Sequence, residues 1–409
     1  MLRRGITPDE IESVLSHYDL GTLVAPPESG GGTANANLKI TTAAGAYFLK
    51  RRDPTGVRVF LQRAQTRESR SRTPFRRSLG CCSDGRDSKY AQESFVAFDH
   101  ALMAHMARRG VKTPRAVAAR DGRTWVRIHG GCCITCLGES QLPPRDRDST
   151  LRASRSALND SYGVTRNPEN ELCNSLHDDV YEVFHYQPGG PHHRHSLPQI
   201  ASAGRALADY HRAARDFDPP PGKEWPRYDD PRLIREGIAA IDAKLKATLG
   251  ADDFDYLTAQ VALLESELPD ERYHSLPKLV IHGDYHPGNM KFIGDEVAGI
   301  FDLDWATVQP RVRDLADGIF LYAGERESDI DAADIFSLTQ TWRPSIERGS
   351  VCMAAYLAAE TVTGEEADAL PLFVRARWLY CRVAGMVKVT PERRIGYFVT
   401  GLLEPLRAM

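Results

Sequence analysis

The residues best suited to chemistry lie in one polar loop and in the acidic pair that follows it. Residues 282–289 read HGDYHPGN, between two short apolar runs whose length and composition are typical of β-strands. Asp302 and Asp304 follow at the end of the second run. A buried carboxylate costs on the order of several kcal/mol unless it is paired or bound to a metal ion. The sequence therefore predicts that Asp284, Asn289 and Asp302 converge on one functional site.

Turn formation is the alternative interpretation of the same residues, because Asp, Asn and Gly favour turns for conformational reasons alone. A plain hairpin, however, needs neither His282 together with Asp284 and Asn289, nor an acid inside the apolar strand at Asp302. We therefore favour a functional site. His282 is expected to buttress the loop by hydrogen bonding, and Asp304 to cap the following turn.

The loop has a recognisable spacing. Asp284-x4-Asn289, with His282 two residues before the acid, resembles the catalytic loop of protein kinases. HGDYHPGN followed by an apolar strand and Asp-Leu-Asp more specifically resembles the aminoglycoside phosphotransferase and choline/homoserine kinase-like family. This resemblance implies that Asp284 orients and deprotonates an acceptor hydroxyl. It also implies that Asn289 and Asp302 hold Mg²⁺ on the phosphates of ATP.

A glycine-rich hairpin near the N-terminus is a candidate phosphate-binding element, because glycine lets backbone N–H groups approach phosphate oxygens. Its glycines are Gly30, Gly31 and Gly32. Three glycines alone are a weak signal, but the strand that ends in Lys50 follows, where a kinase needs an ammonium group on the phosphates. Alternatively, Lys50 is an ordinary lysine at a strand end, beside Arg51 and Arg52.

Two further elements are expected to serve the nucleotide. An amphipathic pattern predicts a helix from about Ala91 to Arg109. The family resemblance implies an acid in this helix that pairs with Lys50; Asp99 is the first candidate and Glu93 the alternative. The apolar run at residues 180–186 predicts a strand. The resemblance implies that its backbone from Glu182 to Phe184 forms the hinge that binds adenine.

Two stretches break the pattern. Residues 61–91 and 132–178 show no sustained period of 2 or 3.6, and the first is rich in Arg, Ser and Thr. Such long irregular stretches are uncommon inside a compact domain. We expect both to be disordered insertions or gene-model artefacts within a nucleotide-binding lobe at residues 1–187. Residues 188–409 are then expected to form a helical lobe with the catalytic loop and the acceptor site.

Composition limits the possible partners. The chain has 409 residues and a net charge of −3, which gives no general basic field for nucleic acid. No apolar run approaches the ~20 residues of a membrane span, and no signal peptide follows Met1. Cys133 and Cys136 lack a second ligand pair for zinc. The sequence therefore favours a cytoplasmic protein that binds neither nucleic acid nor membrane; it does not indicate the oligomeric state.

Together these features predict an α+β, bilobal, protein-kinase-like fold with a small antiparallel sheet and a larger helical lobe. The predicted activity is ATP- and Mg²⁺-dependent transfer of the γ-phosphate to a hydroxyl of an amino alcohol, amino acid or aminosugar. A protein serine/threonine kinase or a non-catalytic pseudokinase are the alternatives. Most acids in the helical lobe are expected to lie on ordinary solvated helix faces, but a few that face the cleft would give a preference for cationic acceptors. These acids are Asp314, Asp317, Glu325, Glu327, Asp329, Asp331, Asp334, Glu360, Glu365, Glu366 and Asp368.

Overall fold

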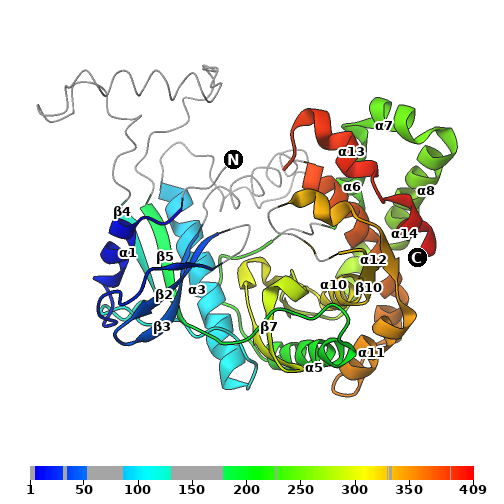
Figure 1. Cartoon of the computed structure of the whole chain (residues 1–409). Helices are drawn as coiled ribbons and strands as arrows, with labels where there is room; N and C mark the ends of the chain where they lie inside the picture. Colours follow the sequence, from blue (N-terminus) through cyan, green and yellow to red (C-terminus); the bar gives the residue numbers. More distant parts are fainter. Residues whose placement is uncertain are drawn as a thin grey trace, which may run out of the picture.

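The chain divides between a small antiparallel sheet and a larger, mostly helical region (Figure 1). The computed structural model describes residues 5–30, 35–52, 86–129, 178–225, 227, 229–328, 330, 334–386 and 388–409. The division confirms the predicted α+β class. The two expected insertions lie outside the described residues except at their C-terminal ends: residues 86–91 begin a helix and Asp178 begins a strand.

The main sheet has five strands in the order β1-β2-β3-β5-β4, and each neighbouring pair is antiparallel. The strands are β1 Glu28–Ser29, β2 Ala36–Thr42, β3 Gly45–Arg51, β4 Trp125–His129 and β5 Asp178–His185. β5 therefore lies inside the sheet, although it is the last of these five strands in the sequence. Alternation of buried and half-exposed residues along β2 and β3 gives the sheet one covered face.

Two helices accompany the sheet. Helix α1, Pro8–Leu15, begins with a capping box in which Thr7 and Glu10 bond each other's backbone N–H groups. Its apolar side, including Ile11 and Val14, packs into a core formed with the sheet. Helix α3, Arg86–Arg108, starts five residues before the expected point and runs between the sheet and the helical region (Figure 1).

The helical region contains the rest of the described elements. Its helices are α5 Leu197–Ala214, α6 Pro231–Ala239, α7 Asp242–Leu249, α8 Ala251–Glu267, α9 Asp270–Ser275, α10 Val312–Tyr322, α11 Ile346–Leu357, α12 Gly364–Met386, α13 Arg394–Val399 and α14 Leu403–Ala408. Short 3-10 helices are η4 Pro287–Asn289, η5 Leu303–Trp305, η6 Ile335–Thr339 and η7 Pro391–Arg393. Among the described helices, none has the length and hydrophobicity that crossing a bilayer requires.

The helical region also contains three short strand pairs, and two of them carry the loops of the site. They are β6 Lys278–Ile281 with β9 Thr307–Pro310, β7 Met290–Ile293 with β8 Glu296–Ile300, and β10 Gly324–Arg326 with β11 Trp342–Pro344. The catalytic loop leaves β6 and enters β7 through η4, and the acidic pair leaves β8 and enters β9 through η5. The two strand pairs, β6 with β9 and β7 with β8, therefore bring both segments to one place.

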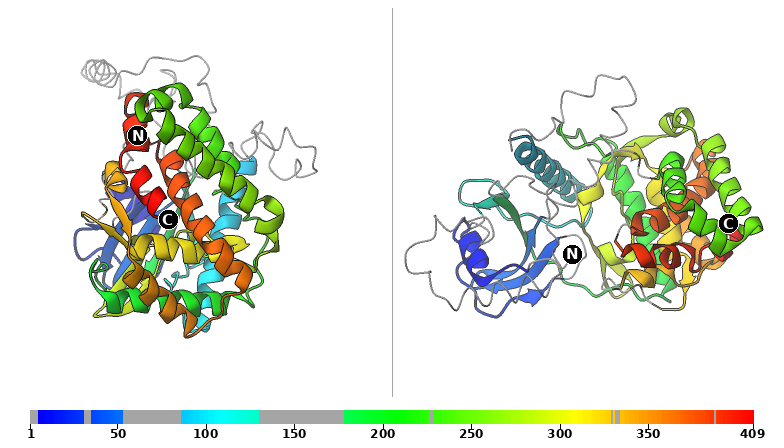
Figure 2. Two further views of the ribbon diagram at one scale, coloured as in Figure 1. Left: turned by 90° about the vertical axis from the view of Figure 1, so that its right-hand side faces the viewer. Right: turned by 90° about the horizontal axis from the view of Figure 1, so that it is seen from above.

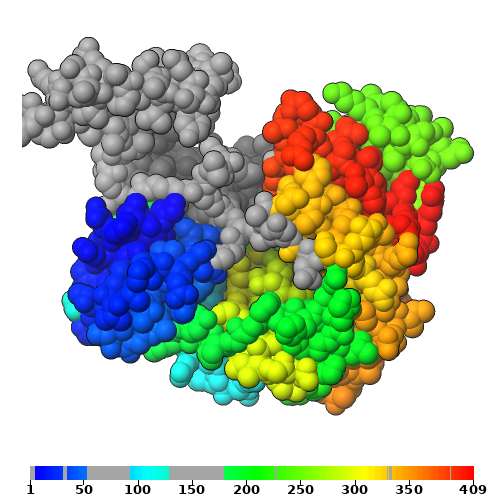
Figure 3. Space-filling view, viewed as in Figure 1, coloured from blue at the N-terminus to red at the C-terminus, as the bar shows by residue number. Residues whose placement is uncertain are grey.

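The sheet and the helical region lie side by side, and the segment between β5 and α5 passes from one to the other (Figures 1 and 2). A central apolar core joins α3, α5, β6–β8 and α11. A second core joins α6, α8, α10 and α12. Figure 3 shows the blue surface of the N-terminal sheet on one side and the orange surface of the helical region on the other. The loops of the site lie where these two parts meet.

The tightest helix contact in the central core depends on a glycine. A Cβ added at Gly204 of α5 would lie 2.3 Å from the carbonyl oxygen of Cys352 in α11, whereas a Cβ at Gly349 of α11 would meet nothing closer than 3.7 Å. Gly204→Ala should lower the free energy of unfolding by about 1–3 kcal/mol because the helices must separate. Gly349→Ala should raise it by about 0.5–1 kcal/mol through helix propensity. Urea denaturation measures both, and two shifts of the same sign would contradict this packing.

Candidate active site

One buried carboxylate holds the loop that carries Asp284. Asp314, in the first turn of α10, accepts hydrogen bonds from the backbone N–H of His282 at 2.7 Å and of Gly283 at 2.9 Å. Gly283 has φ +80° and leaves no room for a Cβ, so only glycine fits this turn. The buried imidazole of His282 lies 2.9 Å from the carbonyl oxygen of Phe301. His282 thus buttresses the loop, as predicted, and Asp314 fixes its backbone.

The carboxylate of Asp284 lies between two nitrogen-bearing side chains. Nη2 of Arg377 is 3.0 Å from Oδ1, and Nε2 of His286 is 3.3 Å from Oδ2. The side-chain amide of Asn289 donates to the carbonyl oxygen of Asp284 at 3.0 Å. Burial raises the pKa of Asp284, but His286 and Arg377 more than offset this and hold the pKa below its usual range. Asp284 is therefore ionised at neutral pH, as a group that accepts a hydroxyl proton must be.

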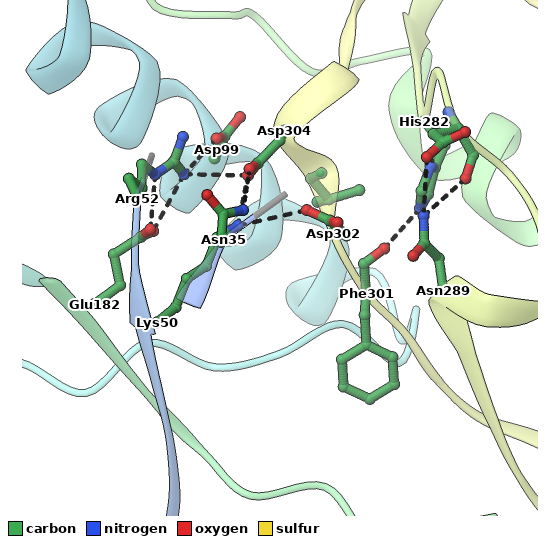
Figure 4. Close-up of polar contacts among 12 residues, drawn as sticks. Asn35, Lys50, Arg52, Asp99, Glu182, His282, Asn289, Phe301, Asp302 and Asp304 are labelled. Carbon is green, nitrogen blue, oxygen red and sulfur yellow. Dashed lines mark hydrogen bonds and ion pairs between the residues drawn. The ribbon is translucent and has the colours of Figure 1, made fainter. Parts of the chain in front are cut away.

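Asp302 has a strained backbone. Its φ of 61° is the one positive φ outside glycine in the described chain, and such conformations cost roughly 1–3 kcal/mol and cluster at functional sites. Its carboxylate lies 3.4 Å from Nζ of Lys50 (Figure 4). Burial and the neighbouring Asp304 raise the pKa of Asp302, whereas Lys50 lowers it. The strain turns this acid toward the lysine of the sheet.

Asp304 has a different partner from the one expected. Its carboxylate lies 2.6 Å from Nζ of Lys50 and accepts a hydrogen bond from Asn35 at 2.8 Å (Figure 4). The predicted role as a turn cap is therefore wrong. Asp304 instead connects the acidic segment at residues 302–304 to β3 and to the residue before β2.

The expected pairing of Lys50 with Asp99 is also wrong for the described residues. Asp99 binds Nη2 of Arg52 at 2.6 Å and the ammonium group of Lys223, while Glu93 pairs with Arg127. Residues 50 and 52 project from the same face of the strand. Arg52 lies nearer to α3 and takes the acid, so that Lys50 is directed to Asp302 and Asp304.

Lys223 joins helix α3 to the acidic loop. Its ammonium group is buried, contacts Asp99 and donates to the carbonyl oxygen of Leu303 at 2.9 Å. Two residues later, Nε1 of Trp225 donates to the carbonyl oxygen of Asp304 at 2.9 Å. Burial lowers the pKa of Lys223, and the neighbouring Asp99 opposes this. The connector before α6 thus fixes two backbone carbonyl groups within η5.

Glu182 and Phe184 do not form the hinge. In β5, Glu182 lies opposite Lys50 of β3 on one side and Trp125 of β4 on the other. Phe184 lies between Phe48 and Ala116 in the same way. A backbone paired on both edges has no group left for adenine. The apolar pattern at residues 180–186 correctly predicted a strand, but it could not show that this strand has a neighbouring strand on each side.

The side chain of Glu182 has a structural role. It lies 2.6 Å from Nε of Arg52 and 2.8 Å from Nε2 of His100 (Figure 4). Burial raises the pKa of Glu182, but Arg52 and His100 hold it well below its usual range. Glu182 thereby links β5 to β3 and α3.

The glycine hairpin is described only in part. Gly30 follows β1, and its N–H donates to the carbonyl oxygen of Asn37 at 2.9 Å. A Cβ at Gly30 would lie 2.8 Å from the ring of Phe48, so the close approach requires glycine. Gly31 and Gly32 lie outside the described residues.

Three cationic residues of the site were missed by the sequence interpretation. Arg52 stood next to Lys50 but was taken as an ordinary neighbour, Lys223 lies in a proline-rich connector, and Arg377 lies in α12. No spacing rule joins them to the catalytic loop, because they are brought there only by tertiary packing.

The contact of Lys223 with Asp99 should be important for stability. Lys223→Met should lower the free energy of unfolding by about 3–5 kcal/mol, because it leaves a buried carboxylate with one partner fewer. Arg235→Met is the matched control: it also removes a cation paired with an acid, Glu265, but the Arg235 side chain is 53% exposed, and loss of such a pair costs under about 1 kcal/mol. Denaturant titration of both variants checks this. Equal shifts would show that Lys223 is not part of the buried framework.

Comparisons with known sequences agree with the resemblance. A family model described as "Phosphotransferase enzyme family" matches residues 164–345. A homoserine kinase of Chelativorans sp. (strain BNC1) is 26% identical, over 90% of this chain and 82% of its own length. One of Rhodopseudomonas palustris (strain ATCC BAA-98 / CGA009) is 27% identical over 95% and 87%. One of Methylocella silvestris is 22% identical over 96% and 92%.

Solved structures share the fold. A microcompartment-associated aminopropanol kinase superposes with a TM-score of 0.55 at 17% identity, over 97% of this chain and 96% of that one. The amicoumacin kinase hAmiN, in complex with AMP-PNP, Ca²⁺ and Ami, has a TM-score of 0.54 at 13% identity, over 98% and 96%. An aminoglycoside phosphotransferase from Alicyclobacillus acidocaldarius has a TM-score of 0.53 at 14% identity, over 100% and 95%.

The family match, the relatives and the fold point the same way, and they confirm the resemblance seen in the sequence. Use of ATP and a divalent cation follows from kinase activity. The chain is a small-molecule kinase with a protein-kinase-like fold and a hydroxyl group as its phosphate acceptor, and its sequence is similar to the phosphotransferase enzyme family and to homoserine kinases.

Proposed function

We propose that Asp284 orients the acceptor hydroxyl and takes its proton as the phosphoryl group is transferred. The observation that carries this proposal is the fixed position of the Asp284 carboxylate. Its loop is bonded to Asp314, and its carboxylate lies within 3.0 Å of Arg377. A carboxylate held in place before the acceptor arrives does not have to be ordered during the reaction.

Asn289 and Asp302 are the proposed holders of Mg²⁺. Carboxylate and amide oxygens suit this hard cation, and the strained backbone of Asp302 supports a role beyond packing. No group of three or more His, Cys, Asp or Glu residues in the described part of the chain could hold a metal by itself. This fits a site completed by phosphate oxygens, as is usual for Mg²⁺ in kinases. When bound, the cation would neutralise charge on the phosphates.

The sheet is the proposed nucleotide side of the site. Lys50 lies beside Asp302, where its ammonium group could contact the phosphates. The sequence Gly30-Gly31-Gly32 is the proposed phosphate-binding element. We now propose residues 186–189, after the end of β5, as the backbone that meets the base. The corresponding lobes would be residues 1–187 for the nucleotide and 188–409 for catalysis and the acceptor.

The proposed acceptor is a small hydroxy amino acid or amino alcohol, and homoserine is the first compound to test. The alignments of this chain with relatives named homoserine kinase extend over more than four fifths of each relative's length. A structure with this fold is that of an aminopropanol kinase. Both acceptors are short chains with a hydroxyl and an amino group.

Replacement of Asp284 should greatly slow phosphoryl transfer without weakening the binding of ATP. Asp284→Asn should lower kcat by roughly 10²–10⁴-fold, the usual contribution of a positioned general base, and change the Kd for ATP by less than about threefold. Coupled-assay kinetics with homoserine and calorimetry with ATP give the two values. A variant that turns over at the wild-type rate would refute the assignment.

Loss of Asp302 should instead weaken the nucleotide complex itself. Asp302→Asn should raise the Kd for ATP by about tenfold or more in the presence of Mg²⁺ and far less with EDTA, because the carboxylate acts through the cation. Asp295→Asn, at the exposed turn between β7 and β8, is the matched control and should leave both values unchanged. Equal Kd values for Asp302→Asn and wild type would leave Asp302 with a structural role only.

A further inference from the structure

Arg377 is the charged residue of α12 that contacts Asp284. Nη2 of Arg377 lies 3.0 Å from Oδ1 of Asp284, and its Nε lies 2.9 Å from Oδ1 of Asp317. Arg377 and Asp284 reach the surface, with 13% and 26% of their side chains exposed, whereas Asp317 is only 1% exposed. Asp317 thus holds the guanidinium from the buried side, and the accessible group beside the catalytic carboxylate is positive.

The acids of the helical region, which suggested a cationic acceptor, are buried, paired with arginine, at the surface or outside the described residues. Asp314 and Asp317 are wholly buried. Glu360 and Glu366 pair with Arg311. Those at the surface are Glu325, Glu327, Asp334, Glu365 and Asp368. Those outside the described residues are Asp329 and Asp331. The buried and paired acids therefore offer no site for an ammonium group.

We propose that Arg377 binds the carboxylate of a hydroxy amino acid and thereby selects this acceptor over an amino alcohol of the same length. The proposal rests on the function proposed above, with the acceptor hydroxyl at Asp284. Arg377 would then be a specificity-determining residue of the kinase.

Distance supports this assignment. The hydroxyl must come within about 2.6–3.2 Å of Asp284 to give up its proton. In homoserine the hydroxyl oxygen and the carboxylate are separated by a three-carbon chain, which spans roughly 5 Å at ~1.5 Å per bond. Because Arg377 contacts Asp284 directly, a carboxylate at that range reaches the guanidinium. A guanidinium has five N–H donors in a planar fork, so one arginine can contact more than one carboxylate.

Charge supports it as well. An anion between Arg377 and the loop gains a charge-assisted hydrogen bond, whereas an ammonium group at the same place is repelled. The contact with Asp317 keeps the guanidinium oriented without the acceptor. An acceptor carboxylate would therefore fix the far end of the chain and leave its hydroxyl at Asp284.

The test compares L-homoserine with 3-aminopropanol, which is the same molecule without its carboxylate. Wild type should favour homoserine in kcat/KM by roughly 10²-fold. Arg377→Met should reduce that preference by ten-fold or more, chiefly by raising the KM for homoserine. Arg377→Lys keeps the charge but loses the planar set of N–H donors, so it should retain part of the preference. This variant also provides the test if Arg377→Met does not fold.

Arg382→Met is the matched control, because Arg382 is a buried arginine of the same helix that bonds to the backbone of Tyr397 and Gly401. It should leave the preference for homoserine unchanged.

Calorimetry with each acceptor and a non-hydrolysable ATP analogue gives a second measurement that does not depend on turnover. Arg377→Met should weaken the binding of homoserine and leave that of 3-aminopropanol within about twofold. If Arg377→Met and Arg377→Lys slow both acceptors equally, Arg377 acts on Asp284 or on the phosphoryl group and the proposal fails. A wild type that uses both acceptors equally also overturns it. If wild type phosphorylates neither compound, the proposed function itself is wrong.

Discussion

A buried network of opposite charges connects the sheet, helix α3 and the acidic loop, and the arrangement of the active site depends on it. Its cations are Lys50, Arg52 and Lys223, and its acids are Asp99, Glu182, Asp302 and Asp304. Each charge is costly to bury alone but tolerable when bonded to its neighbours. Because the members come from β3, β5, α3, the connector before α6 and η5, the network forms only when these elements are in register. It therefore specifies one relative position of the two parts of the kinase.

A second constraint fixes the other half of the site. Gly283 turns the chain at positive φ, and Asp314 accepts the two N–H groups that this turn exposes. These groups would be unsatisfied without that carboxylate, since the loop lies against the apolar core. Asp284 is presented from this rigid backbone, whereas Asp302 is presented from a strained one. In both cases the geometry is established before any ligand binds. Such preorganisation of charged groups is the main source of catalysis in phosphoryl transfer.

Charge differs between the acidic loop and the acceptor side. At the acidic loop the carboxylates of Asp302 and Asp304 compensate Lys50, in an arrangement suited to a cation and phosphates. On the acceptor side Arg377 stands next to Asp284, and its own acid, Asp317, is buried. The fold is shared with kinases of varied acceptors, so the choice of acceptor must come from side chains on helices such as α12.

The sequence by itself determined the resemblance to phosphotransferases, the α+β class and the buttressing role of His282, because these depend on local spacing and on short apolar runs. The catalytic role of the loop at residues 282–289 stays a prediction. The sequence also predicted Lys50 and Asp302 as neighbours of the phosphates, which stays a prediction. The tertiary structure alone decided which acid meets which base: Asp99 binds Arg52 and Lys223 instead of Lys50, and Glu182 lies inside the sheet instead of at the hinge. Arg377 was invisible from the sequence for the same reason. Partners in a buried ion pair are chosen by distance and desolvation in the folded chain, and residues 93 positions apart carry no local signal of their contact.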